Sequence, residues 1–148
     1  MADILQRIAI AAPPDQILPL ITTADGFRAW WTRDVDAKPE KGAVNHFRFH
    51  DGAVEFPFRV DEITPSRVAW TCIEGPKVPP EWLGTRVSFD LFPAASGGVD
   101  LRFAHTNWRE ADQNYAMCNT TWGDLMHRLR DAAEGHGRGP YFERPDQR

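Results

Sequence analysis

Between residues 43 and 104 the chain alternates apolar and polar side chains with a period of two. In the last run of this kind, Val99, Leu101 and Phe103 are separated by charged residues. Such alternation is typical of strands in an antiparallel sheet that buries one face and exposes the other to water. The runs occupy residues 43–49, 56–61, 68–73, 86–91 and 99–104. They predict five strands that share one apolar face.

The N-terminal segment predicts a sixth strand and two short helices. Residues Asp3–Ala11 are rich in isoleucine, and Pro13 and Pro14 close the segment, which favours a strand. Proline is tolerated in the first turn of a helix, so the same pair opens a short helix. Oxygen atoms on residues 22–25 provide caps for a second short helix over Gly26–Trp31.

The last third of the chain changes to a helical period. Its apolar residues recur every three or four positions, which predicts an amphipathic helix over Ala111–Glu134, about 36 Å long. Gly135 ends this helix. Beyond a single domain of residues 1–137, residues 138–148 are expected to form a polar tail that is mobile unless Tyr141 and Phe142 dock. The apolar stripe comprises Tyr115, Cys118, Trp122, Leu125, Met126, Leu129 and Ala133.

The sheet has one apolar face and the helix has one apolar stripe, so we expect the two to pack against each other and bury both from water. The sequence therefore predicts an α+β fold. In it, a curved antiparallel sheet of six strands wraps around a long C-terminal helix, and the two short helices cover what remains. Curvature of the sheet leaves a space beneath the helix, whose size depends on how well the side chains fill it.

Eight residues placed along these elements point to a family: Trp30, Trp31, Gly42, Trp70, Gly84, Thr85, His105 and Trp122. The order of elements and these residues resemble the START-like (SRPBCC) helix-grip superfamily over residues 3–139. Within it, the chain is similar to the branch of the C-terminal domain of the activator of the ninety-kilodalton heat-shock-protein ATPase. The resemblance implies a central cavity for an apolar or aromatic ligand.

Composition narrows the classes of function. The chain has 148 residues and a net charge of −4, which disfavours a general nucleic-acid binder. No apolar run of about 18 residues is present, so no membrane span is expected. The N-terminus lacks the basic start and unbroken apolar stretch of a signal peptide. Together with Cys72 and Cys118, which form no CxxC motif, this predicts a cytoplasmic protein.

Motifs for metals, nucleophiles and phosphates are missing from the sequence. His46 and His50 share a predicted strand, where they would stand about 13 Å apart, too far for one ion. Neither HExxH nor GxSxG occurs, and Gly97-Gly98 is not followed by the Lys and Ser or Thr of a phosphate loop. We therefore expect no metal and no cofactor.

Aromatic residues on the predicted inner faces provide the candidate binding site. They either line a pocket for a small hydrophobic molecule or fill the interior themselves. Polar residues that align with them, Asn45, Glu74 and His105, either orient a ligand or sit at exposed strand ends. The candidate ligand-binding residues are Trp30, Asn45, Phe47, Phe49, Phe58, Trp70, Phe89, Phe103, His105, Tyr115, Trp122 and Met126.

Three functions follow as hypotheses. The first is binding of a small hydrophobic or aromatic molecule without catalysis. The second is a cavity enzyme of the cyclase or hydrolase type, in which His105 moves protons because its ordinary pKa is near 6.5. The third, implied by the resemblance, is regulation of the chaperone ATPase. That contact is expected to be weak, because the activators' separate N-terminal domain contributes strongly to it and no such domain precedes Asp3. The oligomeric state is left open.

Overall fold

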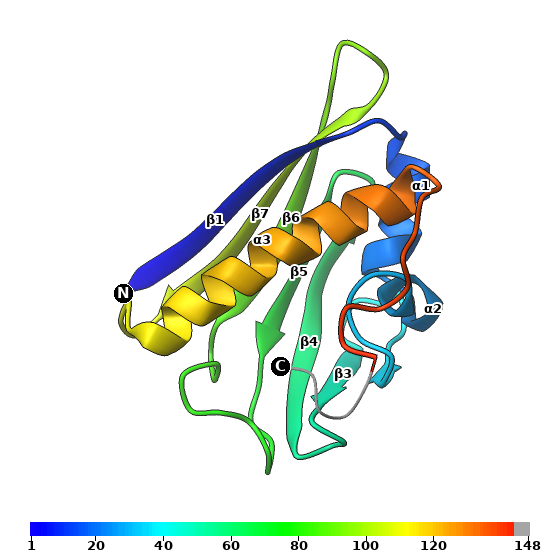
Figure 1. Ribbon diagram of the computed structural model, residues 1–148. Helices are drawn as coiled ribbons and strands as arrows, with labels where there is room; N and C mark the ends of the chain where they lie inside the picture. Colours follow the sequence, from blue (N-terminus) through cyan, green and yellow to red (C-terminus); the bar gives the residue numbers. More distant parts are fainter. Residues whose placement is uncertain (144–148) are drawn as a thin grey trace.

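Strands and helices follow the predicted order in a computed structural model that describes residues 1–143. The first strand leads into short helical segments, then a run of strands, then one long helix (Figure 1). The elements are β1 (Ala2–Ile10), α1 (Pro14–Ile17), the 3-10 helix η1 (Leu18–Ile21), α2 (Ala24–Arg28), β2 (Val35–Asp36), β3 (Val44–Phe49), β4 (Val54–Thr64), β5 (Arg67–Cys72), β6 (Arg86–Pro93), β7 (Val99–Trp108) and α3 (Gln113–Ala133).

Within residues 1–143 the strands form one seven-stranded antiparallel sheet in the order β1-β7-β6-β5-β4-β3-β2. The predicted α+β architecture, an antiparallel sheet under a long C-terminal helix, is confirmed. One strand more than the predicted six is present. It is β2, whose Val35 pairs with Phe47 at the edge of the sheet.

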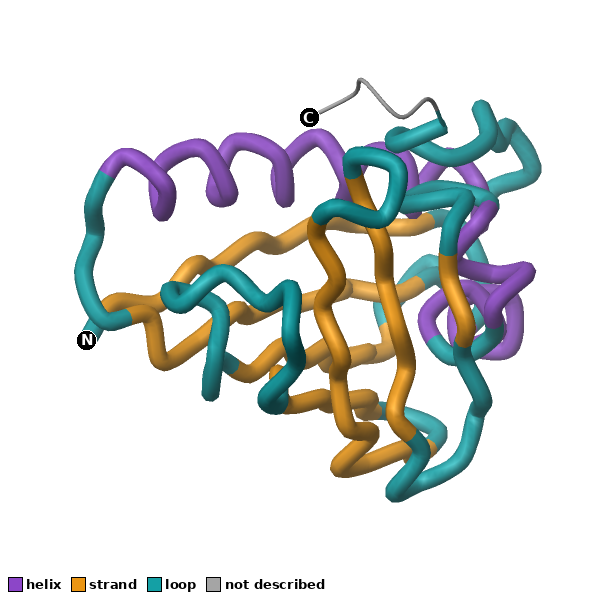
Figure 2. The backbone as a smooth tube through the Cα atoms, turned by 90° about the horizontal axis from the view of Figure 1, so that it is seen from below, coloured by secondary structure: helices purple, strands orange, loops and turns teal. Residues whose placement is uncertain are grey.

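Helix α3 crosses one face of the sheet along nearly its whole length (Figures 1 and 2). Asp112 caps its first turn by accepting a hydrogen bond of 3.0 Å from the backbone N–H of Tyr115. Gly135, with φ at 85°, ends it as predicted. No helix within residues 1–143 is long and apolar enough to cross a lipid bilayer. The buried stripe of α3 comprises Trp122, Leu125, Met126, Leu129 and Ala133.

Polar side chains tie α3 to the edge strand β1. The Tyr115 hydroxyl near the start of the helix donates to the carbonyl oxygen of Asp3 over 2.6 Å. Past the end of the helix, the Glu134 carboxylate accepts the backbone N–H of Ala11 over 2.7 Å. Since the outer edge of β1 has no strand partner among residues 1–143, these contacts cover backbone groups that would otherwise face water.

The short helices close one end of the space under α3. The Thr23 hydroxyl accepts the backbone N–H of Gly26 over 3.0 Å, which confirms the predicted cap of α2. A Cβ on Gly26 would lie 1.9 Å from the carbonyl oxygen of Pro19, so only glycine fits where α2 crosses η1. This close approach brings the fully buried Phe27 onto the aromatic interior.

The segment after α3 docks instead of leaving the molecule. Phe142 forms an isolated parallel bridge with Thr32, and its ring packs edge-on against Phe49 at 4.9 Å between centroids. Of the predicted tail, residues 144–148 lie outside the described part of the chain. The docking of Tyr141 and Phe142 brings this segment to the site described next.

Candidate functional site: an aromatic pocket beside the C-terminal helix

Aromatic rings fill most of the space between the sheet and α3. The ring of Trp31 stacks on Phe47 at 4.3 Å and lies within 7° of parallel to Trp70 at 6.2 Å. On the other side, Phe103 meets Trp122 of α3 at 4.5 Å. The sequence leaves two alternatives open: the aromatic residues line a pocket, or they fill the interior themselves. In most of this interior, the rings fill the space.

A pocket of about 250 Å³ lies beside this filled layer. Its walls come from the segment after α2, β3, β4, α3, the loop before β6 and the segment after α3. Aromatic and aliphatic side chains form most of the wall, and the polar side chains among them are His50, Cys118 and Thr121. The lining residues are Trp31, Phe49, His50, Val54, Phe56, Trp82, Met117, Cys118, Thr121, Trp122, Leu125 and Phe142.

The candidates predicted from the sequence divide into three groups. Phe49 and Trp122 line the pocket. Tyr115 is half-buried and reaches β1 through its hydroxyl. The others are buried in the filled layer or around it, outside the pocket lining, and they have a packing role there. They are Trp30, Asn45, Phe47, Phe58, Trp70, Phe89, Phe103, His105 and Met126.

Several lining residues were not among the sequence candidates. Cys118 and Leu125 belong to the predicted apolar stripe of the helix, four residues before and three residues after Trp122. Their spacing from Trp122 is therefore a signal by which the sequence could have identified them. Trp82 lies in the proline-rich loop before β6, and Phe142 lies in the predicted tail. No periodic pattern marks residues in such segments.

His105 is fully buried with both ring nitrogens hydrogen-bonded. The indole N–H of Trp122 donates to His105 Nδ1 over 3.0 Å, so the ring carries its proton on Nε2. Nε2 then donates to Thr85 Oγ1 over 2.8 Å, and this hydroxyl donates to the carbonyl oxygen of Trp82 over 2.6 Å. Burial lowers the pKa of His105 to about 3. The imidazole has neither a free nitrogen nor a place in the pocket lining, which favours a structural role over the hypothesis of an acid or base.

The other two polar candidates have structural or exposed positions. The Asn45 side-chain oxygen accepts the backbone N–H of Lys38 over 3.0 Å, which holds the loop between β2 and β3. Of the two alternatives for Glu74, the structure agrees with an exposed position past a strand end, because β5 ends at Cys72 and Glu74 is exposed in the following loop.

Metal-ligating side chains are dispersed over the described residues. No group of three or more His, Cys, Asp or Glu side chains within residues 1–143 is placed to hold a metal ion. His46 Nδ1 lies 2.8 Å from a carboxylate oxygen of Glu55, and His50 is exposed in the turn after β3. The pocket therefore offers an apolar wall with few polar groups rather than a coordination site.

Both cysteines are free, and both thiols are held in their neutral form. Burial raises the pKa of Cys118 to about 11, with smaller contributions from the negative charges of Glu81 and Asp112. Burial alone raises the pKa of Cys72 to about 12. A neutral thiol is a weak nucleophile, so at neutral pH Cys118 contributes a small apolar surface to the pocket.

We expect iodoacetamide to modify Cys118 before Cys72, since Cys118 lines the pocket and Cys72 is 1% exposed. Because the thiolate reacts, the rate at Cys118 is expected to rise about tenfold per pH unit up to about pH 10. Peptide mass spectrometry at several pH values measures both rates. Modification of Cys72 first, or a rate at Cys118 that levels off near pH 8.5, would contradict this placement of the thiols.

Comparison with known proteins places the chain in a family. A family model described as Activator of Hsp90 ATPase homolog 1-like protein matches residues 11–134. The solution structure of the Aha1 dimer from Colwellia psychrerythraea is 35% identical, with a TM-score of 0.81 over 92% of this chain and 98% of that chain. Among curated proteins, none matches this chain.

More distant solved structures share the fold. Protein MLL2253 from Mesorhizobium loti is 19% identical, with a TM-score of 0.78 over 90% of this chain and 98% of that chain. CalU16 from Micromonospora echinospora is 15% identical, with a TM-score of 0.73 over 98% of this chain and 71% of that chain. With the family match over most of its length, the chain belongs to the family of Activator of Hsp90 ATPase homolog 1-like proteins.

Proposed function

We propose that this protein binds a small, flat, largely apolar molecule in the pocket between α3, β3 and β4. The observation that carries the proposal is the pocket of about 250 Å³ with its mainly aromatic wall, next to an interior that is otherwise filled. Ligand sites in proteins are concave and mostly apolar, with a few polar groups that fix the orientation.

The size and chemistry of the pocket favour a ligand with one or two aromatic rings. An apolar cavity of about 150 Å³ is enough for benzene. The larger volume here, lined by Trp31, Trp82 and Trp122, suits a two-ring system that stacks on or packs edge-on against the indoles. His50 and Thr121 provide partners for a single hydroxyl or carbonyl group on such a ligand.

The groups at the wall favour binding over catalysis. Cys118 is a neutral thiol at physiological pH, and His105 lies outside the lining with both nitrogens occupied. An enzyme of the cyclase or hydrolase type needs a group that gains or loses a proton near neutral pH beside the substrate. His50 is the one histidine of the lining, and its side chain sits in an exposed turn without a described partner to orient it.

We expect 2-naphthol, a flat two-ring compound with one hydroxyl, to stabilise the protein against heat. A ligand that binds only the native state adds roughly 2.7 kcal/mol at a hundredfold excess over its Kd. For a chain of this length, that raises Tm by several degrees. Thermal unfolding followed by tryptophan fluorescence, at increasing concentrations of 2-naphthol, measures the shift.

A pair of variants on α3 locates the binding. Cys118→Trp places an indole inside the pocket and is expected to abolish the shift in Tm, whereas Thr120→Trp places it on the exposed side of the helix and preserves the shift. The absence of any shift in the unmodified protein, or the same shift in both variants, would count against the proposed function.

A further inference from the structure

The segment after α3 doubles back over the molecule and is fastened to the outside of the helix. We call residues 139–143 the C-terminal strap. The Arg128 guanidinium donates to the carbonyl oxygen of Gly139 over 2.7 Å and lies 5.4 Å from the centroid of the Tyr141 ring. Arg138, just before the strap, pairs with Asp131 over 3.1 Å. The strap therefore runs from the end of α3 back past the short helices toward β3 (Figure 1).

Three backbone hydrogen bonds hold the far end of the strap to the segment after α2. Phe142 N–H donates to the carbonyl of Trp31 over 2.9 Å, Arg33 N–H donates to the carbonyl of Phe142 over 3.2 Å, and Tyr141 N–H donates to Trp30 over 3.3 Å. These hydrogen bonds form a single isolated β-bridge, between Thr32 and Phe142. A strand in the sheet, by comparison, is paired along its whole length.

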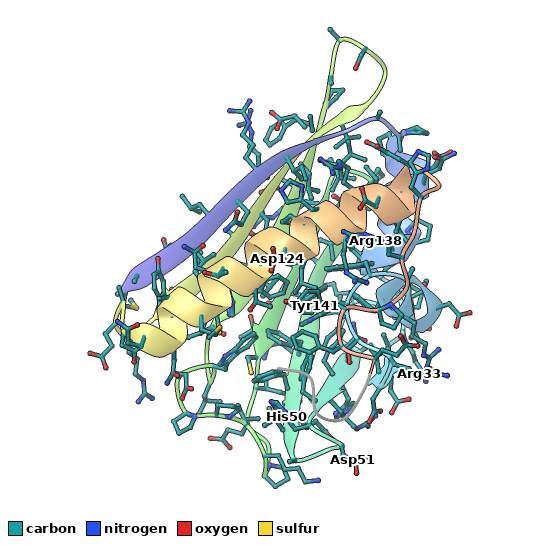
Figure 3. All side chains as sticks on the ribbon, viewed as in Figure 1. Arg33, His50, Asp51, Asp124, Arg138 and Tyr141 are labelled. Atoms are coloured by element: carbon teal, nitrogen blue, oxygen red, sulfur yellow. The ribbon has the colours of Figure 1, made fainter. Side chains whose placement is uncertain are left out.

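Two polar side-chain contacts of the strap are exposed to solvent. The Tyr141 hydroxyl lies 3.5 Å from an Asp124 carboxylate oxygen (Figure 3). Arg33 pairs with Glu143 over 3.3 Å. Ion pairs of this kind contribute little to stability, because water and salt screen them. Local opening of such a weakly fastened segment costs much less than global unfolding.

Phe142 is the one apolar anchor of the strap that reaches the pocket. Its half-buried ring lines the pocket and packs against Phe49 of β3. Most of the other walls belong to β3, β4 and α3, which are held by sheet or helical hydrogen bonds. Trp82 lies in the loop before β6, where its backbone N–H donates to Pro79 over 3.0 Å and its ring stacks on Phe56 at 4.0 Å. One wall of the pocket is thus carried by an element that is far more weakly attached than the others.

We propose that Phe142 is a movable wall that sets the size of molecule the pocket admits, and that the C-terminal strap opens to let larger aromatic molecules enter. With the strap in place, the pocket has a volume of about 250 Å³ and Phe142 forms one of its walls. The nature of the ligand rests on the proposed function, but the movement of the wall does not, since Cys118 reports access to the pocket without any ligand.

The test compares alkylation of Cys118 by a small reagent, iodoacetamide, and a large one, N-(1-pyrenyl)maleimide. Phe142→Ala is expected to raise the rate with the large reagent about tenfold and to leave the rate with the small one within about twofold, because access follows the population of the open state. The matched control is Phe92→Ala, which removes an exposed ring at the end of β6. Peptide mass spectrometry assigns the modified cysteine.

A second variant separates a movable wall from a fixed one. Arg128→Met keeps Phe142 but removes the hydrogen bond to Gly139, and it is expected to raise the rate with the large reagent about threefold or more. If Phe142→Ala does not fold, as judged by its thermal transition, Phe142→Leu replaces it. Equal effects of Phe142→Ala on both reagents, or no effect of Arg128→Met, would overturn the proposal. These outcomes are independent of whether 2-naphthol binds.

Discussion

Leu129→Arg is expected to abolish the cooperative thermal transition of the protein. Leu129 lies on the buried stripe of α3 and is 0% exposed, so the substitution places a charge where the helix meets the aromatic interior. An unpaired buried charge costs several kcal/mol, and loss of the leucine contacts costs roughly 2–5 kcal/mol more. A domain of this kind has a total stability of about 5–15 kcal/mol.

The matched control for this substitution is His127→Arg, two residues earlier on the exposed side of α3. Its free energy of unfolding is expected to stay within about 0.5 kcal/mol of that of the unmodified protein. Circular dichroism at increasing temperature, on both variants at one protein concentration, measures the difference. Equal melting temperatures would contradict the packing of the Leu129 side of α3 against the sheet.

The second large effect is a loss of stability in acid that depends on His105. Burial lowers the pKa of His105 to about 3, whereas in the unfolded chain it titrates near 6.5. Between these values the unfolded state binds a proton that the folded state does not, so stability falls as pH falls from about 6.5 toward 3. From pH 7 to pH 5 the loss is roughly 2 kcal/mol for this one group.

His105→Gln removes this titration and is expected to reduce the pH dependence by the same amount. The variant is less stable at pH 7 by roughly 1–3 kcal/mol, because it leaves the indole N–H of Trp122 without its acceptor. The exposed His127→Gln serves as the control and keeps the original dependence. Urea unfolding at pH 7 and pH 5 measures how much the free energy of unfolding of each protein changes between the two pH values. The same dependence in His105→Gln and the unmodified protein would show that His105 does not carry it.

Much of the fold could be predicted because its sheet is exposed on one side. In β7, Leu101 and Phe103 are buried, while Arg102 between them is exposed, and this difference is what the sequence alternation records. The stripe of α3 was equally clear, since the solvent-facing side of the helix is polar. The strand β2 gave no such signal, because two residues are too few to show a period.

The pocket was harder to predict than the fold that holds it. The alternation of apolar and polar residues predicts that Phe47 and Phe49 face inward. In the structure, Phe47 stacks under Trp31, and of the two only Phe49 reaches the pocket. Whether an inward-facing ring packs under another ring or lines the pocket depends on ring orientation and on the loops at the strand ends. Trp82 and Phe142 lie in segments outside the strands and helices, where proline and glycine interrupt any periodic alternation of apolar and polar residues.

Titration with 2-naphthol, followed by the NMR signals of the six tryptophan indole N–H groups, tests the account most directly. Three of these indoles, Trp31, Trp82 and Trp122, line the pocket, and the other three, Trp30, Trp70 and Trp108, are buried outside its lining. We predict the largest shifts for the first three, because the rings of a bound ligand lie against them. No shifts at saturating ligand, or the largest shifts at Trp30, Trp70 and Trp108, would contradict binding in this pocket.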